Sequence, residues 1–386
     1  MHKSLKGIKV IDLTQSVAGP FATQILGDFG AEVIKVEKMD GGDDTRRWGP
    51  PFWGDQSPHF LAYNRNKLSI SLNLKIESDL LIFKEMIKEA DVFVQNLRPG
   101  ALDKLGLDES EIFKLNSKII YCSINAFGHT GYYKNKPGYD PLLQAFSGLM
   151  SLNGEENGEP VRIPASILDQ GTAMWCVIAI QNALRNRDLT GEGSRIETSL
   201  LNTALMWLPA QYIGYFADGT VPPKNGSGTV GIAPYQAYPT KDGHIIIAAG
   251  NEKLWEKLCK AIDRLDLLND SRFKDNPTRV ENKIPLYKEL SDTLKSENTD
   301  FWDNKLSKNS IPVTPIYSLN EVVAHDQVND IQGFFNIKHN SLGDIKLVQT
   351  PFVINGKYLE GHLPPPELNE HGEQIRAKYK LVEEEV

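Results

Sequence analysis

The amino-acid sequence predicts an α/β fold, with a large doubly wound parallel-sheet domain and a smaller α+β domain. Up to about residue 125, short apolar runs of strand character alternate with longer runs of helical character. A helix between successive strands favours parallel pairing, because parallel strands need a long crossover connection. A stretch rich in glycine and proline begins at residue 222, and a hairpin and several helices are expected after it.

The first strand, helix and strand are expected at residues 7–13, 21–30 and 31–37. The loop between the first strand and the helix reads TQSVAGP. In a parallel sheet this loop lies at the carboxyl edge, where such folds bind their ligands. The loop lacks the GxGxxG pattern, so the sequence does not predict a dinucleotide site here.

Basic residues recur after successive predicted strands. Any single one of them is most simply a solvated surface charge. Their repeated placement after strand ends instead indicates one basic rim suited to phosphate groups. These residues are Lys38, Lys67, Lys75, Arg98 and Lys104. The later strands are expected at residues 69–75, 91–95, 119–124 and 195–200, and a helix at 80–90. Residues 137–150 are expected to begin with a turn and to enter an apolar helix that starts at Tyr139 and Asp140.

Residues 222–234, PPKNGSGTVGIAP, contain a literal GxGxxG at Gly226, Gly228 and Gly231. We do not interpret it as a dinucleotide site, because no strand precedes it and Pro234 would break the helix that should follow. A mobile loop is favoured, and its backbone N–H groups can bind an anion.

The chain after this loop defines the expected domains. A hairpin is expected at residues 235–250, strands at 342–353, and a disordered acidic tail, VEEEV, at the end. We therefore expect a large domain at residues 1–221, a small domain at 222–330 and a return to the large domain at 331–386.

Composition restricts the function classes. The chain has 386 residues and a net charge of −8, which argues against general nucleic-acid binding. No apolar run is long enough to be a signal core or to span a membrane. The three cysteines lie far apart and are expected to be reduced thiols of a cytoplasmic protein. The eight histidines show no metal-binding spacing, so no metal site is predicted.

The stretch at residues 161–186 contains a single acidic residue, Asp169, which precedes a mostly apolar helical run. Asp169 is therefore expected just before the start of a buried helix. In one interpretation it is the N-cap of that helix, and the local sequence alone favours this, because aspartate is among the commonest caps. In the other, it is a reactive carboxylate in a cleft, kept ionised by the helix start.

Several motifs together resemble those of the class III CoA-transferases, the family of formyl-CoA transferase and the carnitine CoA-transferases. They occur in the family's order and cover nearly the whole chain. The glycine loop and the DGHIIIAAGN hairpin are similar as well. The main blocks are LKGIKVIDLTQSVAGP, GAEVIKVEKMDGGDDTRRWGPP, ADVFVQNLRPGALDKLGL, INAFGHTGYYKNKPGYDPLLQAFSGLM, PASILDQGTAM and TGEGSRIETSLLN.

This resemblance implies a covalent chemistry. A carboxylate attacks an acyl-CoA thioester to form a mixed aspartyl anhydride, and the CoA thiolate then forms an enzyme–CoA thioester. An acceptor acid reverses both steps. The family's nucleophile falls on Asp169, which reverses the preference for a cap. The substrates would be an acyl-CoA and a carboxylic acid, with no permanently bound cofactor.

The resemblance also implies further site residues. Gln15 and Ala18 would line the thioester site, and Tyr139 and Asp140 would lie near the reacting centre. The loop from Gly226 to Gly231, which includes Gly228, would close over it. Where the oxalate-using enzyme has histidine this chain has Gln15, and its glycine loop is not a pure glycine run, so oxalate is not favoured as a substrate. The residues expected to contact CoA are Lys38, Leu72, Asn73, Lys75, Asn96, Leu97, Arg98 and Lys104.

The family fold implies a homodimer of two interlocked, ring-like chains. One alternative function is an acyl-CoA racemase of the same fold, but Tyr139 occupies the position of its catalytic histidine, and tyrosine is a poor base at neutral pH. His129 lies in a nearby turn and is a weaker candidate for that base. The other alternative is a CoA-binding protein without catalysis. The sequence leaves the donor and acceptor acids open.

Overall fold

The computed structural model describes residues 3–359 and 362–380, and the predicted acidic tail lies outside these residues. The chain forms two compact units. The first contains the residues up to 149, residues 162–219 and those from 330 onward, and the second contains residues 150–161 and 220–329. The expected division into domains at residues 221 and 330 stays a proposal, and we describe each unit by itself.

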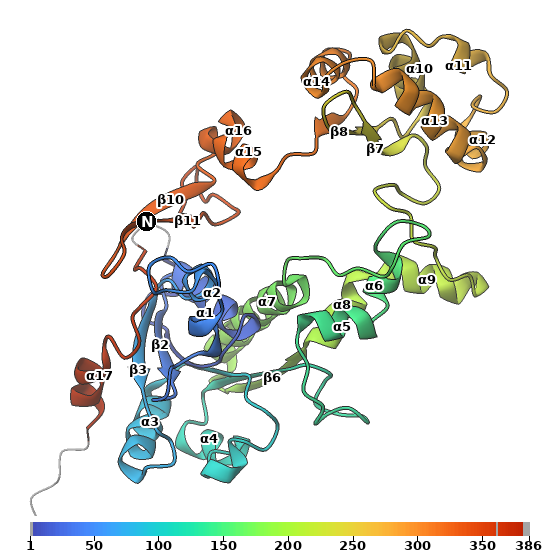
Figure 1. Cartoon of the computed structure of the whole chain (residues 1–386). Coiled ribbons are helices and arrows are strands. Elements are labelled where there is room, and N and C mark those ends of the chain that lie inside the picture. Colours follow the sequence, from blue (N-terminus) through green and yellow to red (C-terminus); the bar gives the residue numbers. More distant parts are fainter. Residues whose placement is uncertain (1–2, 360–361, 381–386) are drawn as a thin grey trace, which may run out of the picture. The chain divides into compact units, whose positions relative to one another are not determined.

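A six-stranded, entirely parallel sheet forms the centre of the first unit (Figure 1). The strand order is β3-β2-β1-β4-β5-β6, so the direction of winding reverses between β1 and β4. In open α/β sheets this reversal opens a crevice at the carboxyl ends of the strands, where ligands bind. The strands are β1 (Lys9–Leu13), β2 (Glu32–Glu37), β3 (Lys67–Ser71), β4 (Val92–Gln95), β5 (Ile120–Asn125) and β6 (Ser194–Ser199).

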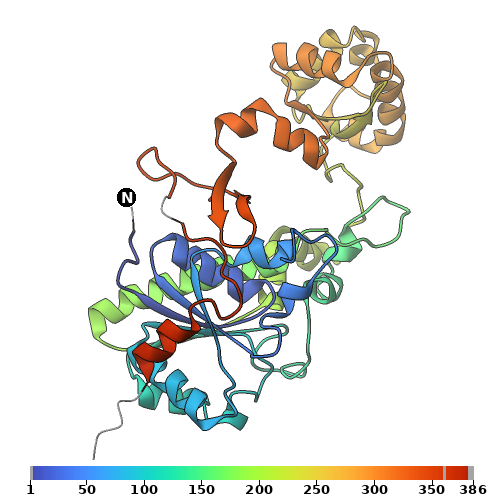
Figure 2. The same ribbon diagram turned by 60° about the vertical axis from the view of Figure 1, so that its left-hand side comes forward.

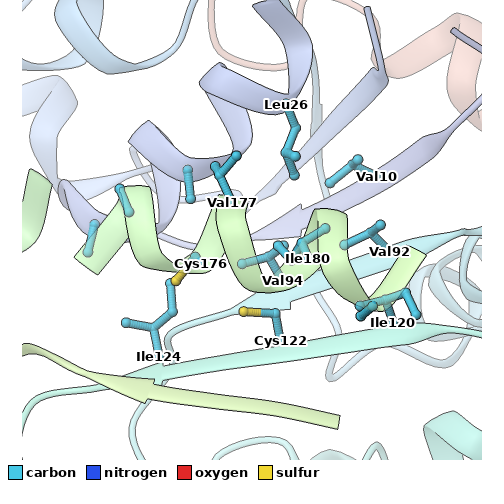
Figure 3. Packing of buried hydrophobic residues seen from close by; sticks show 14 of the residues in the cluster. Val10, Leu26, Val92, Val94, Ile120, Cys122, Ile124, Cys176, Val177 and Ile180 are labelled. Atoms are coloured by element: carbon cyan, nitrogen blue, oxygen red, sulfur yellow. The ribbon is translucent and has the colours of Figure 1, made fainter. Parts of the chain in front are cut away.

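Helices cover both faces of this sheet, which confirms the predicted doubly wound architecture. Alternate residues of a strand point to opposite faces, so Val10 of β1 packs beneath α1 and α7 while Ile11 packs on the other side. Figure 3 shows Val177 of α7 and Leu26 of α1 in the first of these two cores. The covering helices are α1 (Ala18–Asp28) and α7 (Ile167–Thr190) on one face, and α3 (Glu77–Glu89), α4 (Glu109–Leu115) and α17 (Gly372–Tyr379) on the other.

Shorter elements complete the first unit. The C-terminal helix α17 returns to pack on α3 and β3 (Figure 2). The remaining helices are η1 (Asp44–Arg47), α2 (Pro58–Tyr63), η2 (Asp103–Leu105), α5 (Asp140–Phe146), α8 (Leu200–Trp207) and α9 (Pro209–Asp218). Helix α6 (Leu149–Leu152) lies at the border between the units.

The strands expected at residues 342–353 form a local hairpin. β11 (Gly343–Val348) pairs antiparallel with β10 (Phe334–His339), and the two make a separate two-stranded sheet. The sequence interpretation missed β10. The short turn between these strands lets them pair locally, so this return of the chain does not extend the large sheet.

The second unit is an α+β fold, as expected. Its antiparallel sheet has the order β7-β8-β9, and its core includes Trp255, Phe273 and Trp302. β7 begins directly after Pro234, so no helix follows the GxGxxG sequence. The strands are β7 (Tyr235–Pro239), β8 (His244–Ala248) and β9 (Val313–Pro315). The helices are α10 (Glu252–Ala261), α11 (Asp266–Asn269), α12 (Asn276–Glu281), α13 (Lys283–Leu294), α14 (Thr299–Lys308), α15 (Leu319–Ala324) and α16 (Asp326–Asp330).

Three element boundaries differ from the expectation at places that matter for the site. β3 ends at Ser71, so residues 72–75 form a loop. The helix expected to run from Asp140 to residue 150 begins at Asp140 but is broken at Gly148, whose φ of 81° lies in the left-handed region. Helix α7 begins at Ile167, two residues before Asp169. Among the described residues, no helix is long and apolar enough to cross a membrane.

Candidate active site at the carboxyl edge of the sheet

Asp169 lies in the first turn of α7, and it is not the N-cap of that helix. The cap position is Ser166, whose side chain makes no capping hydrogen bond. The acceptor comes from another helix: Asp140 Oδ2 accepts the backbone N–H groups of Leu168 at 2.7 Å and of Asp169 at 3.2 Å. The cap interpretation of Asp169 is therefore wrong, because Asp140 already occupies the position in which a cap would act.

The carboxylate of Asp169 is therefore not needed to accept the backbone N–H groups at the start of α7. In the described part of the chain, no group donates a hydrogen bond to it. Burial raises its pKa to about 7, and the nearby charge of Asp140 adds to the rise. The expectation that the helix start keeps Asp169 fully ionised is corrected, because burial and a like charge outweigh it. A buried carboxyl group whose pKa is raised toward neutral pH is typical of a reactive group.

The loop after β1 lies beside the start of α7. Helices α1 and α7 pack along each other, and both begin at the carboxyl edge of the sheet. Ala18, the first residue of α1, is buried in the same core cluster as Leu168. The structure thus brings the predicted thioester loop and Asp169 to one end of the same helix pair.

Gln15 is joined to Asn96 across the point where the winding reverses. The Gln15 N–H donates to Asn96 Oδ1 at 2.9 Å, and Asn96 Nδ2 donates to the Gln15 carbonyl at 2.7 Å. This reciprocal pair uses both ends of the Asn96 carboxamide. Asn96 therefore fixes the backbone of the loop, and any contact with CoA would have to use its remaining surface.

A buried ion pair is hydrogen-bonded to the backbone of the same loop. Lys35 Nζ donates to the Thr14 carbonyl at 2.8 Å and lies 2.9 Å from the carboxylate of Asp43. Asp43 Oδ1 accepts the N–H of Ser16 at 3.1 Å. Ser16 has a φ of 72°, a left-handed conformation that costs roughly 1–3 kcal/mol for a residue other than glycine. The ion pair supplies contacts that keep Ser16 in this strained conformation.

A pocket of about 460 Å³ opens at the carboxyl ends of β1, β2 and β3. Its walls are largely apolar, with leucine, valine and methionine side chains, and its lining also includes two lysines and three acidic residues. The apolar part suits the base of a nucleotide, and the lysines suit its phosphates. Six of the residues predicted from the sequence line it: Gln15, Lys38, Leu72, Asn73, Lys75 and Leu97.

The other predicted CoA contacts lie outside this pocket. Arg98 lines an adjacent pocket of about 240 Å³, which shares the wall formed by Leu97. Lys104 lies in η2 and lines neither of these two pockets. Within the larger pocket, Lys38 is bonded to Asp44 at 2.6 Å, so a phosphate would compete with that carboxylate.

Tyr139 and Asp140 are neighbours with different environments. Tyr139 precedes α5 and is 57% exposed, whereas Asp140 is 2% exposed. Gln144 Nε2 donates to the second oxygen of Asp140 at 2.5 Å. Asp140 is thus held between α5 and α7.

The glycine loop belongs to the second unit and is bonded within it. The N–H of Gly226 donates to the Gly154 carbonyl at 3.0 Å, and the N–H of Gly228 donates to the Asn225 carbonyl at 2.9 Å. At the other end of the loop, the buried Arg279 donates to the Ala233 carbonyl at 2.7 Å. Both ends of the loop are therefore anchored.

Sequence reasoning missed two residues beside Asp169. Gln170 follows it in the first turn of α7 and donates from Nε2 to Tyr63 Oη at 3.2 Å. The Tyr63 ring packs edge-on against Phe21 of α1, with centroids 5.4 Å apart. Gln170 could have been suggested from the sequence, because it directly follows Asp169. Tyr63 lies more than a hundred residues away, and no sequence pattern indicates that it approaches Gln170.

The family of this chain follows from comparison with known proteins. The sequence profile of CoA-transferase family III matches residues 5–372, so the chain belongs to this family and is an enzyme of the CoA-transferase class. The human succinyl-CoA:glutarate CoA-transferase is 39% identical over 97% of this chain and 85% of its own length. An acetyl-CoA:oxalate CoA-transferase of Acetobacter aceti is 36% identical over 98% and 96% of the two chains. The crystal structure of a CAIB/BAIF family protein from Brucella suis superimposes with a TM-score of 0.89 at 36% identity, covering 98% of this chain and all of that one.

Replacing Asp140 by asparagine should lower the pKa of Asp169. Asparagine can still accept the N–H of Leu168, but it removes the negative charge that raises this pKa. We expect ¹³C NMR titration of the Asp169 carboxyl carbon to give a midpoint below that of the unchanged protein. An unchanged or higher midpoint would contradict the electrostatic coupling.

Asp140→Ala, which leaves the helix start without its acceptor, should also destabilise the fold by about 1 kcal/mol.

Proposed function

We propose that this chain transfers CoA from an acyl-CoA to a carboxylic acid through covalent intermediates on Asp169. The observation that carries the proposal is the free carboxylate of Asp169 at the start of α7. Asp140 satisfies the backbone there, and burial raises the pKa of Asp169 to about 7, so the ionised carboxylate is accessible near neutral pH. Membership in CoA-transferase family III supplies the reaction class.

In the first step, an Asp169 oxygen attacks the thioester carbonyl carbon. A C–O bond forms, the C–S bond breaks, and CoA leaves as a thiolate, which gives a mixed anhydride. In the second step, the thiolate attacks the aspartyl carbonyl. The new C–S bond gives an aspartyl–CoA thioester, and the donor acid leaves as its carboxylate. An acceptor carboxylate then reverses the two steps, so no proton or oxidant is consumed.

The pocket beside β1, β2 and β3 is our proposed site for the nucleotide of CoA. The exposed cation Lys75 would pair with a phosphate, and the leucine-rich wall would pack on the base. Gln15 lines this pocket and belongs to the loop that leads into α1. The pantetheine arm would follow this loop toward Asp169, and Asn96 would position the loop through its backbone.

The names of the similar proteins suggest small dicarboxylic acids as substrates of this chain. The human relative is named for succinyl-CoA with glutarate, and the relative from Acetobacter aceti is named for acetyl-CoA with oxalate. We propose succinyl-CoA as donor and a longer dicarboxylate such as glutarate as acceptor. Gln15 in place of histidine and the NGSGTVG loop make oxalate the less suitable acceptor.

We expect the purified enzyme to give a new acyl-CoA when succinyl-CoA is mixed with glutarate. The test is a mass-spectrometric screen of several acyl-CoA donors crossed with a panel of carboxylic acids. Asp169→Ala and the nearly isosteric Asp169→Asn should each lose several orders of magnitude in rate, because both remove the nucleophile. Binding of CoA without turnover of any pair would instead indicate a non-catalytic protein.

No observation favours the racemase alternative. Tyr139 is exposed, and His129 Nδ1 lies 3.2 Å from Glu197 at the carboxyl end of β6. His129 lines the pocket that contains Arg98, on the opposite face of the sheet from α7.

We also propose that the glycine loop closes over the reacting carbonyl. Since Gly226 and Gly228 already donate their N–H groups, the donors would come from the residues that follow, around Gly231. Gly228 would instead allow the tight turn: an added Cβ would lie 3.0 Å from Asn225 Nδ2 and 3.1 Å from Gln236 Oε1.

Gly228→Val should lower turnover more than it lowers CoA affinity, because it displaces the loop and leaves the nucleotide pocket intact. Steady-state kinetics and calorimetric titration with CoA measure the two effects. Gly158→Val is the matched control, since a Cβ there meets only ordinary contacts at 3.4 Å. Full turnover in Gly228→Val would exclude this role for the loop.

We infer a homodimer, with the interlocked rings of the family fold. Exposed apolar side chains gather on α8 and α9, among them Met206, Ile213 and Phe216, and such a surface is typical of an interface. Sedimentation at nanomolar concentration distinguishes a linked dimer from a freely dissociating one.

The three cysteines are buried free thiols, which supports a cytoplasmic location.

A further inference from the structure

The phenol of Tyr63 lies close enough to Asp169 for the charge of that carboxylate to raise its pKa, and the mechanism above does not use its hydroxyl. Tyr63 ends α2, and its ring is held edge-on against Phe21. Gln170, the residue after Asp169, donates to Tyr63 Oη at 3.2 Å. Helices α1 and α7 therefore fix this phenol from two sides, and α7 is the helix that carries the nucleophile.

The geometry leaves the phenol with a proton to donate. Its oxygen already accepts from Gln170, and the described residues include no acceptor for its own O–H. Burial raises the pKa of Tyr63, and the charges of Asp169 and Asp140 raise it further. The phenol therefore stays protonated at neutral pH and lies within electrostatic reach of both carboxylates.

Packing explains the aromatic ring but not the hydroxyl. Phenylalanine would make the same contact with Phe21, and Gln170 could bond to water instead. A half-buried hydroxyl that is oriented by a neighbouring amide is useful where negative charge develops during a reaction. In the proposed reaction, such charge develops on the carbonyl oxygen that Asp169 converts into an oxyanion.

We propose that Tyr63 is a further catalytic residue, whose O–H donates a hydrogen bond to this oxyanion; the inference rests on the proposed role of Asp169. As the Asp169 oxygen bonds to the carbonyl carbon, the C=O π electrons move to the oxygen that Tyr63 faces. When the tetrahedral intermediate collapses, the C=O bond re-forms and the C–S bond breaks. The phenolic proton stays on Tyr63 throughout, so the step balances without a general acid.

The test is Tyr63→Phe, which removes only the hydroxyl and keeps the contact with Phe21. Rapid mixing of the enzyme with succinyl-CoA, followed by intact-protein mass measurement, gives the rate at which Asp169 is acylated. Loss of one oxyanion donor should slow this rate about 100-fold. Calorimetric affinity for free CoA should not change, and the pH midpoint of the rate should stay where it is in the unchanged enzyme.

Tyr379→Phe is the matched control. Its hydroxyl also accepts a hydrogen bond, from Lys9 Nζ at 2.9 Å, but Lys9 begins β1 at the opposite edge of the sheet. This variant should react at the normal rate. Because it removes the same atom from the same unit, it separates a general loss of stability from a loss of catalysis.

Two results would overturn the inference on Tyr63 alone. One is a normal acylation rate in Tyr63→Phe while Asp169→Ala is inactive. The other is a shifted pH midpoint with an unchanged maximal rate, which would mean that Tyr63 bonds to the ground-state carboxylate of Asp169. Full activity of Asp169→Ala would instead overturn the proposed function, so the two failures are distinguishable.

Discussion

The site depends on the hydrogen bonds that Asp140 makes to the start of α7. A helix begins with backbone N–H groups that have no partner within the helix, and a nearby side chain usually satisfies them. Here the acceptor comes from α5, so the carboxylate in the first turn of α7 need not serve as the cap. Burial raises the pKa of Asp169, and the charge of Asp140 adds to this rise. Asp140 thus fixes the start of the helix that carries the proposed nucleophile and contributes to the protonation of that nucleophile.

The second constraint is the buried ion pair behind the loop after β1. Lys35 and Asp43 are both fully buried, and removing two charges from water costs several kcal/mol per ion before their attraction is counted. Their hydrogen bonds go to Thr14 and Ser16, which flank Gln15. This ion pair supports the edge of the sheet where ligands bind, while apolar residues fill the sheet's two main cores.

Much of the architecture could be predicted from the sequence, because strand and helix periodicity are local signals. All six strands of the main sheet were expected, and the resemblance pointed to residues that share one pocket, such as Leu72, Lys75 and Leu97. What failed depends on contacts between distant segments. The use of Asp140 as a cap joins residues 28 positions apart, and Asn96 bonds to a backbone 81 positions away. Tyr63 and Gln170 lie 107 positions apart in the sequence, and no local sequence pattern indicates that they are in contact.

The proposed mechanism requires that Asp169 carries CoA covalently. It is tested by the intact mass of the enzyme after mixing with succinyl-CoA alone, followed by peptide mapping of the trapped adduct. We expect a mass increase of one CoA less one water, located on the peptide that contains Asp169, and no such adduct in Asp169→Asn. An adduct on another side chain, or transfer that proceeds with no enzyme-bound CoA at any stage, would contradict it.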